Sequence, residues 1–104
     1  MKSIAPDELR TRLRGGDPPY VLDVREPEEM ADGVIPGSVN IPMDQVGDRL
    51  RELPPDRDIV VICHLGGRSA YVTNRLNAIG YERAVNLAGG VDAWLDLPRD
   101  GLTY

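Results

Sequence analysis

Two short apolar runs constrain the fold of this chain more than any other feature. Residues 20–24 and 59–62 are almost continuously apolar and rich in β-branched side chains, with no alternation of apolar and polar positions. A strand with one face in water alternates, whereas unbroken runs are typical of strands that are covered on both faces. We therefore expect both segments at the centre of a sheet. Weaker strands are expected at residues 3–4, 38–41 and 84–87.

Amphipathic segments separate these strands. In the clearest one, predicted to be a helix over residues 69–79, Val72, Leu76 and Ile79 fall on one face and Gly80 is placed for a left-handed C-terminal cap. The long connections between strands favour crossovers over hairpins, which predicts a mostly parallel sheet with helices on both faces, a three-layer α/β fold. We expect one domain over residues 1–104. Shorter helices are expected over residues 6–14, over residues 46–53 before Pro54-Pro55, and from Gly89-Gly90 through Trp94.

Charge and composition exclude several classes of function. The 12 basic and 17 acidic residues give a net charge of −5, which disfavours a phosphate-binding surface and hence a nucleic-acid partner. The longest apolar run is far shorter than the roughly 20 residues of a membrane-spanning helix. The amino end resembles neither a secretory nor a transit signal, and the single Cys and single His provide neither an internal disulfide nor a typical zinc site. We therefore expect a cytoplasmic protein without a metal or membrane contact.

Cys63 ends the most apolar strand, and a loop that contains Gly66 and Gly67 connects it to the clearest helix. In open parallel sheets, ligands bind beyond the carboxyl ends of the strands. Paired glycines permit a tight curl that turns N–H groups inward, and the helix amino terminus adds further N–H groups at the same point. Such surroundings lower the pKa of a thiol from about 8.5. Cys63 is therefore a predicted nucleophile, provided that these amides point inward and the sulfur is reachable; the alternative is an inert buried cysteine.

The neighbours of Cys63 each have a functional and a structural interpretation. His64 either attracts an anionic donor or faces solvent. Arg68 either binds the donor's charge as a planar fork or ties the loop to a distant carboxylate, and we favour the second interpretation. Ser69 is interpreted first as the N-cap of the helix, and contact with a bound anion is its alternative role. Outside the loop, Asp23 and Arg25 are either catalytic groups or a buried ion pair, and we favour the ion pair, whereas Trp94 is expected in the core.

The segment from Cys63 to Ser69 resembles the active-site loop of the rhodanese, or thiosulfate sulfurtransferase, family in its single-domain form. The family's other signatures are matched in the same order by residues 22–26 with Glu29, by residues 33–42 and by residues 87–94. The resemblance implies a five-stranded parallel sheet and a Cys63 that holds one sulfane sulfur as a persulfide. It also implies a substrate-binding loop composed of His64, Leu65, Gly66, Gly67, Arg68 and Ser69.

The resemblance implies a reaction as well. The Cys63 thiolate attacks the outer sulfur of thiosulfate or a related donor, sulfite leaves, and cyanide, a thiol or a sulfur-relay protein then accepts the sulfur, without a cofactor. Two departures from the family pattern concern the donor: Val34 stands where a His is common, and His64 stands where a permanent cation is frequent. Because a neutral imidazole attracts a dianion weakly, thiosulfate is expected to be a surrogate donor.

Two other functions compete with sulfur transfer. Cysteine-dependent phosphatases that resemble this domain use a wider loop with five residues between Cys and Arg, whereas four residues separate Cys63 from Arg68. A non-catalytic rhodanese-like binding or regulatory module is the second alternative, and the presence of Cys63 in an intact loop argues against it. A thioredoxin-like redox role is disfavoured because there is no second Cys.

Overall fold

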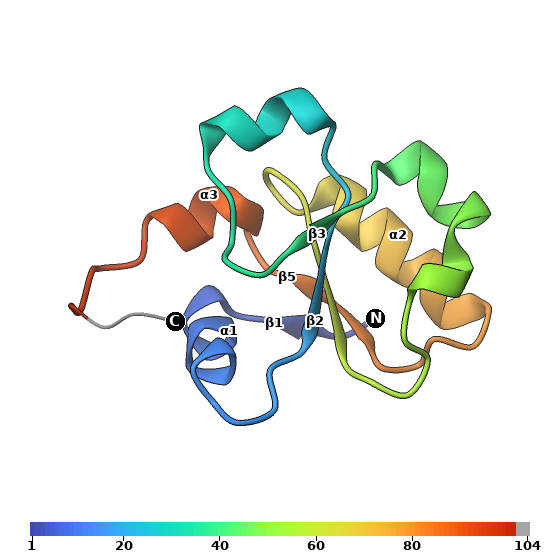
Figure 1. The fold of residues 1–104 in the computed structure, drawn as a ribbon, viewed down its shortest axis with the longest axis horizontal. Helices are drawn as coiled ribbons and strands as arrows, with labels where there is room; N and C mark the ends of the chain where they lie inside the picture. The colour runs from blue at the N-terminus through green and yellow to red at the C-terminus, as the bar shows by residue number, and fades with distance from the viewer. Residues whose placement is uncertain (102–104) are drawn as a thin grey trace.

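The computed structural model describes residues 1–101, and its centre is a sheet of five parallel strands (Figure 1). The strand order is β1-β5-β4-β2-β3, and all neighbours are parallel. β4 is the central strand and β2 lies beside it, so both unbroken apolar runs lie inside the sheet, as predicted. The strands are β1 (Ser3–Ile4), β2 (Tyr20–Asp23), β3 (Val39–Asn40), β4 (Ile59–Ile62) and β5 (Ala84–Leu87).

Helices cover both faces of this sheet, which confirms the predicted three-layer α/β architecture. α1 (Pro6–Leu13) and α3 (Gly90–Leu95) pack on one face. α2 (Gly67–Ala78) packs on the other face. Three 3₁₀ segments lie in the connections: η1 (Pro27–Asp32) after β2, and η2 (Met43–Asp48) and η3 (Leu50–Glu52) after β3.

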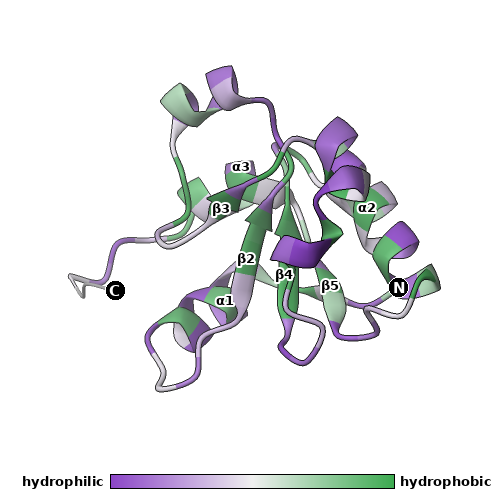
Figure 2. Cartoon of the chain, turned by 45° about the vertical axis from the view of Figure 1, so that its right-hand side comes forward, coloured by the Kyte–Doolittle hydropathy of each residue, from purple (hydrophilic) through white to green (hydrophobic). Residues whose placement is uncertain are grey.

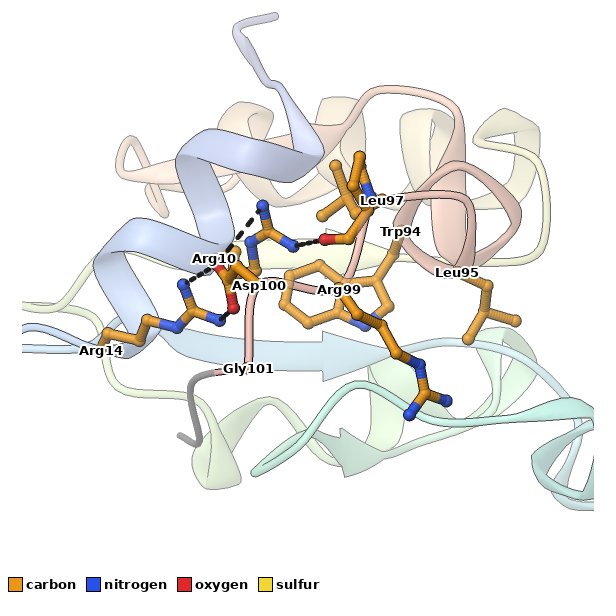
Figure 3. Close-up of a pocket in the computed structure, with 9 residues that line it drawn as sticks. Arg10, Arg14, Trp94, Leu95, Leu97, Arg99, Asp100 and Gly101 are labelled. Atoms are coloured by element: carbon orange, nitrogen blue, oxygen red, sulfur yellow. Dashed lines mark hydrogen bonds and ion pairs between the residues drawn. The ribbon is translucent and has the colours of Figure 1, made fainter.

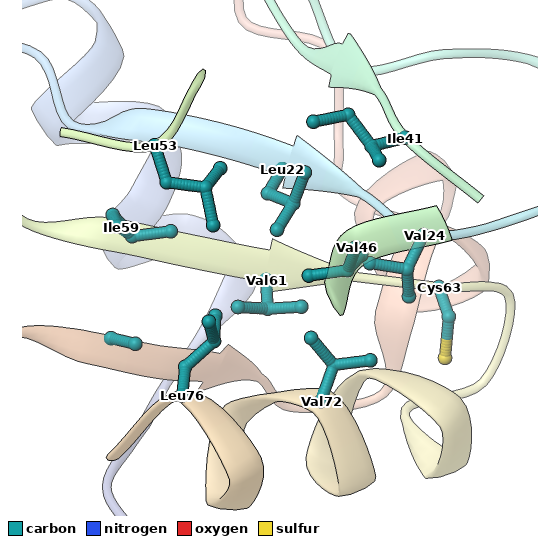
Figure 4. Close-up of a cluster of buried hydrophobic side chains, with 11 residues drawn as sticks. Leu22, Val24, Ile41, Val46, Leu53, Ile59, Val61, Cys63, Val72 and Leu76 are labelled. Atoms are coloured by element: carbon teal, nitrogen blue, oxygen red, sulfur yellow. The ribbon is translucent and has the colours of Figure 1, made fainter. Parts of the chain in front are cut away.

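The side chains of β4 divide between two apolar cores, one for each face. Val61 belongs to the core that contains Leu76 of α2, whereas Val60 belongs to the core that contains Leu9 of α1. Both sides of the strand are therefore buried, which explains why its sequence does not alternate, and the strand is uniformly hydrophobic in Figure 2. Cys63 continues the α2 side and lies at the end of that core (Figure 4).

The helix predicted over residues 46–53 is wrong. The chain forms the two 3₁₀ segments η2 and η3 instead, which are separated by Arg49 with φ −123° and ψ 24°. Gly47 and Asp48 disfavour an α-helix at this point. Val46 and Leu53 are nevertheless buried against the α2 side of the sheet. The apolar spacing thus predicted correctly that these two side chains are buried, but it did not predict that the backbone forms 3₁₀ segments.

The carboxyl end of α2 also departs from the prediction at one residue. Gly80 has φ 109° and follows the helix as the predicted left-handed cap. The last helical residue, however, is Ala78, and Ile79 is the C-cap with φ −105°. Its side chain is 56% exposed, so Ile79 does not share the buried face of Val72 and Leu76.

The loops after β2 and β4 meet at one edge of the sheet, because parallel strands place their carboxyl ends together. Asp23, the last residue of β2, is opposite Ile62, the last residue of β4. The amide of Val24 donates to Ile62 O at 2.9 Å, so pairing continues to the point where Cys63 begins the next loop. Within residues 1–101, no helix is long and apolar enough to span a membrane.

Candidate functional site

The loop from β4 to α2 curls around the sulfur of Cys63. The amides of Gly66 and Ser69 both donate to Sγ, at 3.1 Å and 3.4 Å. Gly66 has φ 108°, in the left-handed region that glycine adopts without strain, and it is the N-cap of α2. Amides of the loop and of the first turn of α2 therefore converge on one sulfur atom, as the nest predicted from the sequence requires.

Ser69 is the residue whose role differs most from the first interpretation. It is the third residue of α2, not its N-cap, and its side chain is fully buried. Its Oγ lies 3.3 Å from Sγ of Cys63, close enough for a hydrogen bond. The N-cap interpretation fails because α2 begins at Gly67 and Gly66 is its N-cap. Ser69 therefore lies inside the first turn of the helix, with its side chain toward the sulfur.

The environment of Cys63 favours its thiolate. Burial raises the pKa of the thiol, but the hydroxyl of Ser69 and the amides of Ser69, Gly66 and Leu65 lower it, and the net result is a pKa below the ordinary value. The hydrogen-bond donors thus outweigh desolvation. A lowered pKa and a set of fixed donors are the properties of a cysteine that acts as a nucleophile.

Cys63 is also well covered, which the sequence does not indicate. The residue is only 1% exposed and belongs to the core between the sheet and α2 (Figure 4). The amides around Sγ point inward, as predicted, but the expectation of a reachable sulfur is not met, because Cys63 is covered in this structure.

Arg68 does tie the loop to a distant carboxylate, the interpretation favoured from the sequence. Its two terminal nitrogens donate to the two carboxylate oxygens of Glu29, at 2.6 Å and 2.8 Å. The pKa of Glu29 is lowered to about 2, chiefly by the hydrogen bond from Arg68. The site therefore contains a carboxylate from η1 that sequence reasoning assigned to a family signature but not to a partner.

A short-range pattern does exist around Glu29. The amide of Glu26 donates to Glu29 Oε1 at 3.0 Å, and the Glu26 side chain accepts from the backbone of Glu29, which together form a capping box at the start of η1. The spacing Glu26-Pro27 followed by Glu29 could have predicted this turn. It could not have predicted that Glu29 also binds Arg68, 39 positions further along the chain.

The other predicted loop residues lie at the surface. His64 is exposed, and its Nε2 is 3.9 Å from Asp92 Oδ1. Leu65 is 64% exposed, although its amide is one of the groups that lower the pKa of Cys63. Neither side chain forms a hydrogen bond with Sγ in the described residues. His64 and Leu65 therefore border the site and leave the sulfur to the backbone.

Helix α3 donates two backbone hydrogen bonds to the start of the loop. The amide of Val91 donates to Cys63 O at 2.8 Å, and the amide of Asp92 donates to His64 O at 3.1 Å. Gly90 has φ 65°, and a Cβ there would stand 2.4 Å from His64 O and 2.5 Å from Cys63 O. Only glycine allows α3 to approach the loop backbone so closely.

Two structural interpretations from the sequence are confirmed. Arg25 is 1% exposed and donates through Nη2 to Asp23 Oδ2 at 2.8 Å, so the two residues form a buried ion pair. Arg25 also donates to the carbonyls of Glu29 and Gly33, which anchors η1 beside the loop. Trp94 is 7% exposed and belongs to the core between α1 and α3.

A hollow lies between α1 and the segment after α3. It has a volume of about 410 Å³, and Arg10, Arg14 and Trp94 line it (Figure 3). Arg14 forms two hydrogen bonds with Asp100, at 2.6 Å and 2.8 Å, which hold the segment after α3 against α1. Within the described part of the chain, no group of three or more His, Cys, Asp or Glu residues could hold a metal ion.

Comparison with known proteins identifies the family. Residues 5–97 match the rhodanese-like domain. A sulfurtransferase from Allochromatium vinosum is 37% identical over 94 residues, covering 90% of this chain and 88% of that protein. The putative sulfur carrier protein YrkF from Bacillus subtilis is 38% identical over 91 residues, covering 88% of this chain and 49% of that protein.

The structural comparison agrees. The crystal structure of a rhodanese-like domain protein from Staphylococcus aureus superposes with a TM-score of 0.85 and 41% identity, covering 99% of this chain and 97% of that one. Sequence and fold are thus similar over nearly the whole length, and the similarity includes the strand, loop and helix that hold Cys63. The chain belongs to the family of rhodanese-like domains.

Proposed function

We propose that the chain is a sulfurtransferase that carries a sulfane sulfur as a persulfide on Cys63. The observation that supports this most directly is the convergence of the Gly66 and Ser69 amides and the Ser69 hydroxyl on Sγ. These donors stabilise negative charge at one point and are in place before any reaction, which is the most effective form of electrostatic catalysis. The similarity to the Allochromatium vinosum sulfurtransferase supports the same assignment.

The proposed reaction has two displacement steps. The Cys63 thiolate attacks the outer sulfur of thiosulfate or a related donor, the S–S bond breaks, and sulfite or a thiolate leaves with the bonding electrons. Cyanide or a thiol then attacks the terminal sulfur of the persulfide and regenerates the Cys63 thiolate. In each step one S–S bond to the transferred sulfur breaks while a new S–S or C–S bond to it forms, and no external oxidant or reductant is required.

Proteins are also proposed as partners for this sulfur. A persulfide is a group that can be passed between cysteines, and the similarity to the putative sulfur carrier protein YrkF supports a relay. We propose a thiol-bearing protein as one acceptor, in addition to small thiols. The phosphatase alternative is disfavoured because Arg68, the residue that would bind phosphate, is held by Glu29 through both terminal nitrogens.

The test is intact-mass measurement after incubation with thiosulfate and, separately, with an organic persulfide. We expect the protein to gain one sulfur atom, to lose it on addition of cyanide, and to gain none in the Cys63→Ser variant. Ser is a suitable replacement because it fits the same space and keeps a hydrogen-bonding atom near Ser69. A protein that gains no sulfur from either donor would contradict the proposal and favour a binding module.

A further inference from the structure

Asn86 of β5 is a buried polar residue with an unpaired oxygen. The residue is only 7% exposed, and its Oδ1 has no hydrogen-bond partner within residues 1–101. Buried polar atoms are nearly always hydrogen-bonded, and an unpaired one costs the protein stability. Leucine has a similar branched shape and would occupy the position without that cost. The stability of the fold therefore does not explain why a carboxamide lies here.

Asn86 lies beside the strand that leads to Cys63. It pairs in register with Val61 of β4. Val61 and Cys63 both belong to the core on the α2 side of the sheet (Figure 4), and the side chains of two residues paired in register point to the same face. The carboxamide therefore lies on the same face of the sheet as the sulfur, next to the residue two positions before Cys63.

The nitrogen end of this carboxamide faces the loop that holds the sulfur. A Cβ at Gly66 would stand 3.9 Å from Nδ2 of Asn86 and 3.7 Å from Leu87 O, so Gly66 packs against the end of β5. The amide of the same glycine donates to Sγ of Cys63 at 3.1 Å. One residue thus connects the carboxamide to the sulfur. Nδ2, and not Oδ1, is among the three atoms nearest to that Cβ position, so the carbonyl end is the more distant one.

This orientation has an electrostatic consequence. A carboxamide is a dipole whose positive end is the N–H end, and a fixed dipole that presents this end to an anion stabilises the anion. The reverse orientation would oppose negative charge on the sulfur. The Gly66 and Ser69 amides act on Sγ in the same sense as Asn86 does. The unpaired Oδ1 is then the consequence of holding the N–H end toward the loop.

Building on the proposed sulfur transfer, we propose that Asn86 is a positioning residue for Cys63, which presents the N–H end of its carboxamide to the loop at Gly66 and so favours negative charge at the sulfur. It acts across Gly66 and does not touch Sγ. The same orientation favours the persulfide, whose terminal sulfur carries the negative charge after sulfite or a thiolate has left. No bond to Asn86 forms or breaks in either step.

The experiment is a pH titration of the ultraviolet absorbance of the thiolate. Cys63 is the only cysteine, so the difference from the Cys63→Ser variant reports on this residue alone. Asn86→Leu and Asn86→Ala both remove the dipole, and each is expected to raise the midpoint by about 0.3–0.5 pH unit, the size of a charge–dipole interaction across one residue. Asn74→Leu makes the same change at an exposed position of α2 and should leave the midpoint unchanged.

The two variants at position 86 separate the dipole from a general loosening of the loop. Leucine fills the space, whereas alanine leaves a cavity, so Asn86→Leu should unfold at a higher Tm than Asn86→Ala. Equal midpoint shifts in the two variants would support the inference. An unchanged or lower midpoint, or a shift that appears only in the less stable alanine variant, would overturn it. The titration needs no sulfur donor, so a wild-type protein that gains no sulfur in the intact-mass test contradicts the proposed function and leaves the role of Asn86 to be decided separately.

Discussion

Replacing Gly90 by alanine should disturb the site by displacing the backbone of the loop at Cys63 and His64. The added Cβ would stand 2.4 Å from His64 O and 2.5 Å from Cys63 O, and both atoms belong to backbone that cannot rotate away. Overpacking of this kind costs about 1–3 kcal/mol. The left-handed conformation at φ 65° adds roughly 1–2 kcal/mol for any residue with a Cβ.

Gly37→Ala is the matched control for this substitution. Gly37 has a similar φ of 79°, but its Cβ would meet nothing within 4 Å, so it carries the conformational cost without the collision. Thermal unfolding should therefore give a Tm for Gly90→Ala at least about 4 °C below that of Gly37→Ala. Alkylation of Cys63 as a function of pH should shift upward in Gly90→Ala only, because the loop amides no longer face Sγ. Equal Tm values and equal alkylation profiles would refute the reasoning.

Three other predictions follow from single contacts. Ser69→Ala removes the hydroxyl next to Sγ, so the pKa of Cys63 should rise and alkylation should need higher pH; an unchanged profile would show that the backbone amides suffice. The pKa of Glu29 is lowered to about 2, so the stabilisation from its ion pair with Arg68 is present above the usual carboxyl pKa and is lost as the pH falls toward 2. Urea titrations should therefore show a difference in unfolding free energy between wild type and Glu29→Gln of at most about 1 kcal/mol at neutral pH, and this difference should vanish over that acidic range. Leu76→Ala should cost about 2–5 kcal/mol in the same assay, whereas Tyr71→Ala, at an exposed position, should cost about 0.5 kcal/mol or less; comparable losses would contradict the assigned core.

The sequence predicted the parts of the fold that depend on short-range patterns. The unbroken apolar runs identified β2 and β4 as interior strands because burial on both faces removes alternation. The same reasoning failed for residues 46–53, where apolar spacing is equally compatible with the 3₁₀ segments that form. Periodicity reports which side chains are buried more reliably than it reports the hydrogen-bonding pattern of the backbone.

The position of Cys63 could also be predicted from the sequence alone. Cys63 ends a central parallel strand and is followed directly by a glycine loop and a helix. Because these segments are consecutive, the amides of the loop and of the first helical turn lie close to the sulfur. Strand, loop and helix are consecutive here, and local geometry therefore decides the outcome.

Only the tertiary structure decided which distant groups complete the site. Glu29 meets Arg68 across 39 positions, and Gly90 meets the Cys63–His64 backbone only because β5 pairs with β4 and brings α3 behind the loop. The orientation of the Ser69 side chain toward Sγ also depends on the residue at which α2 begins. A pattern of neighbouring residues carries no information about such approaches, because they are set by the packing of whole elements against one another.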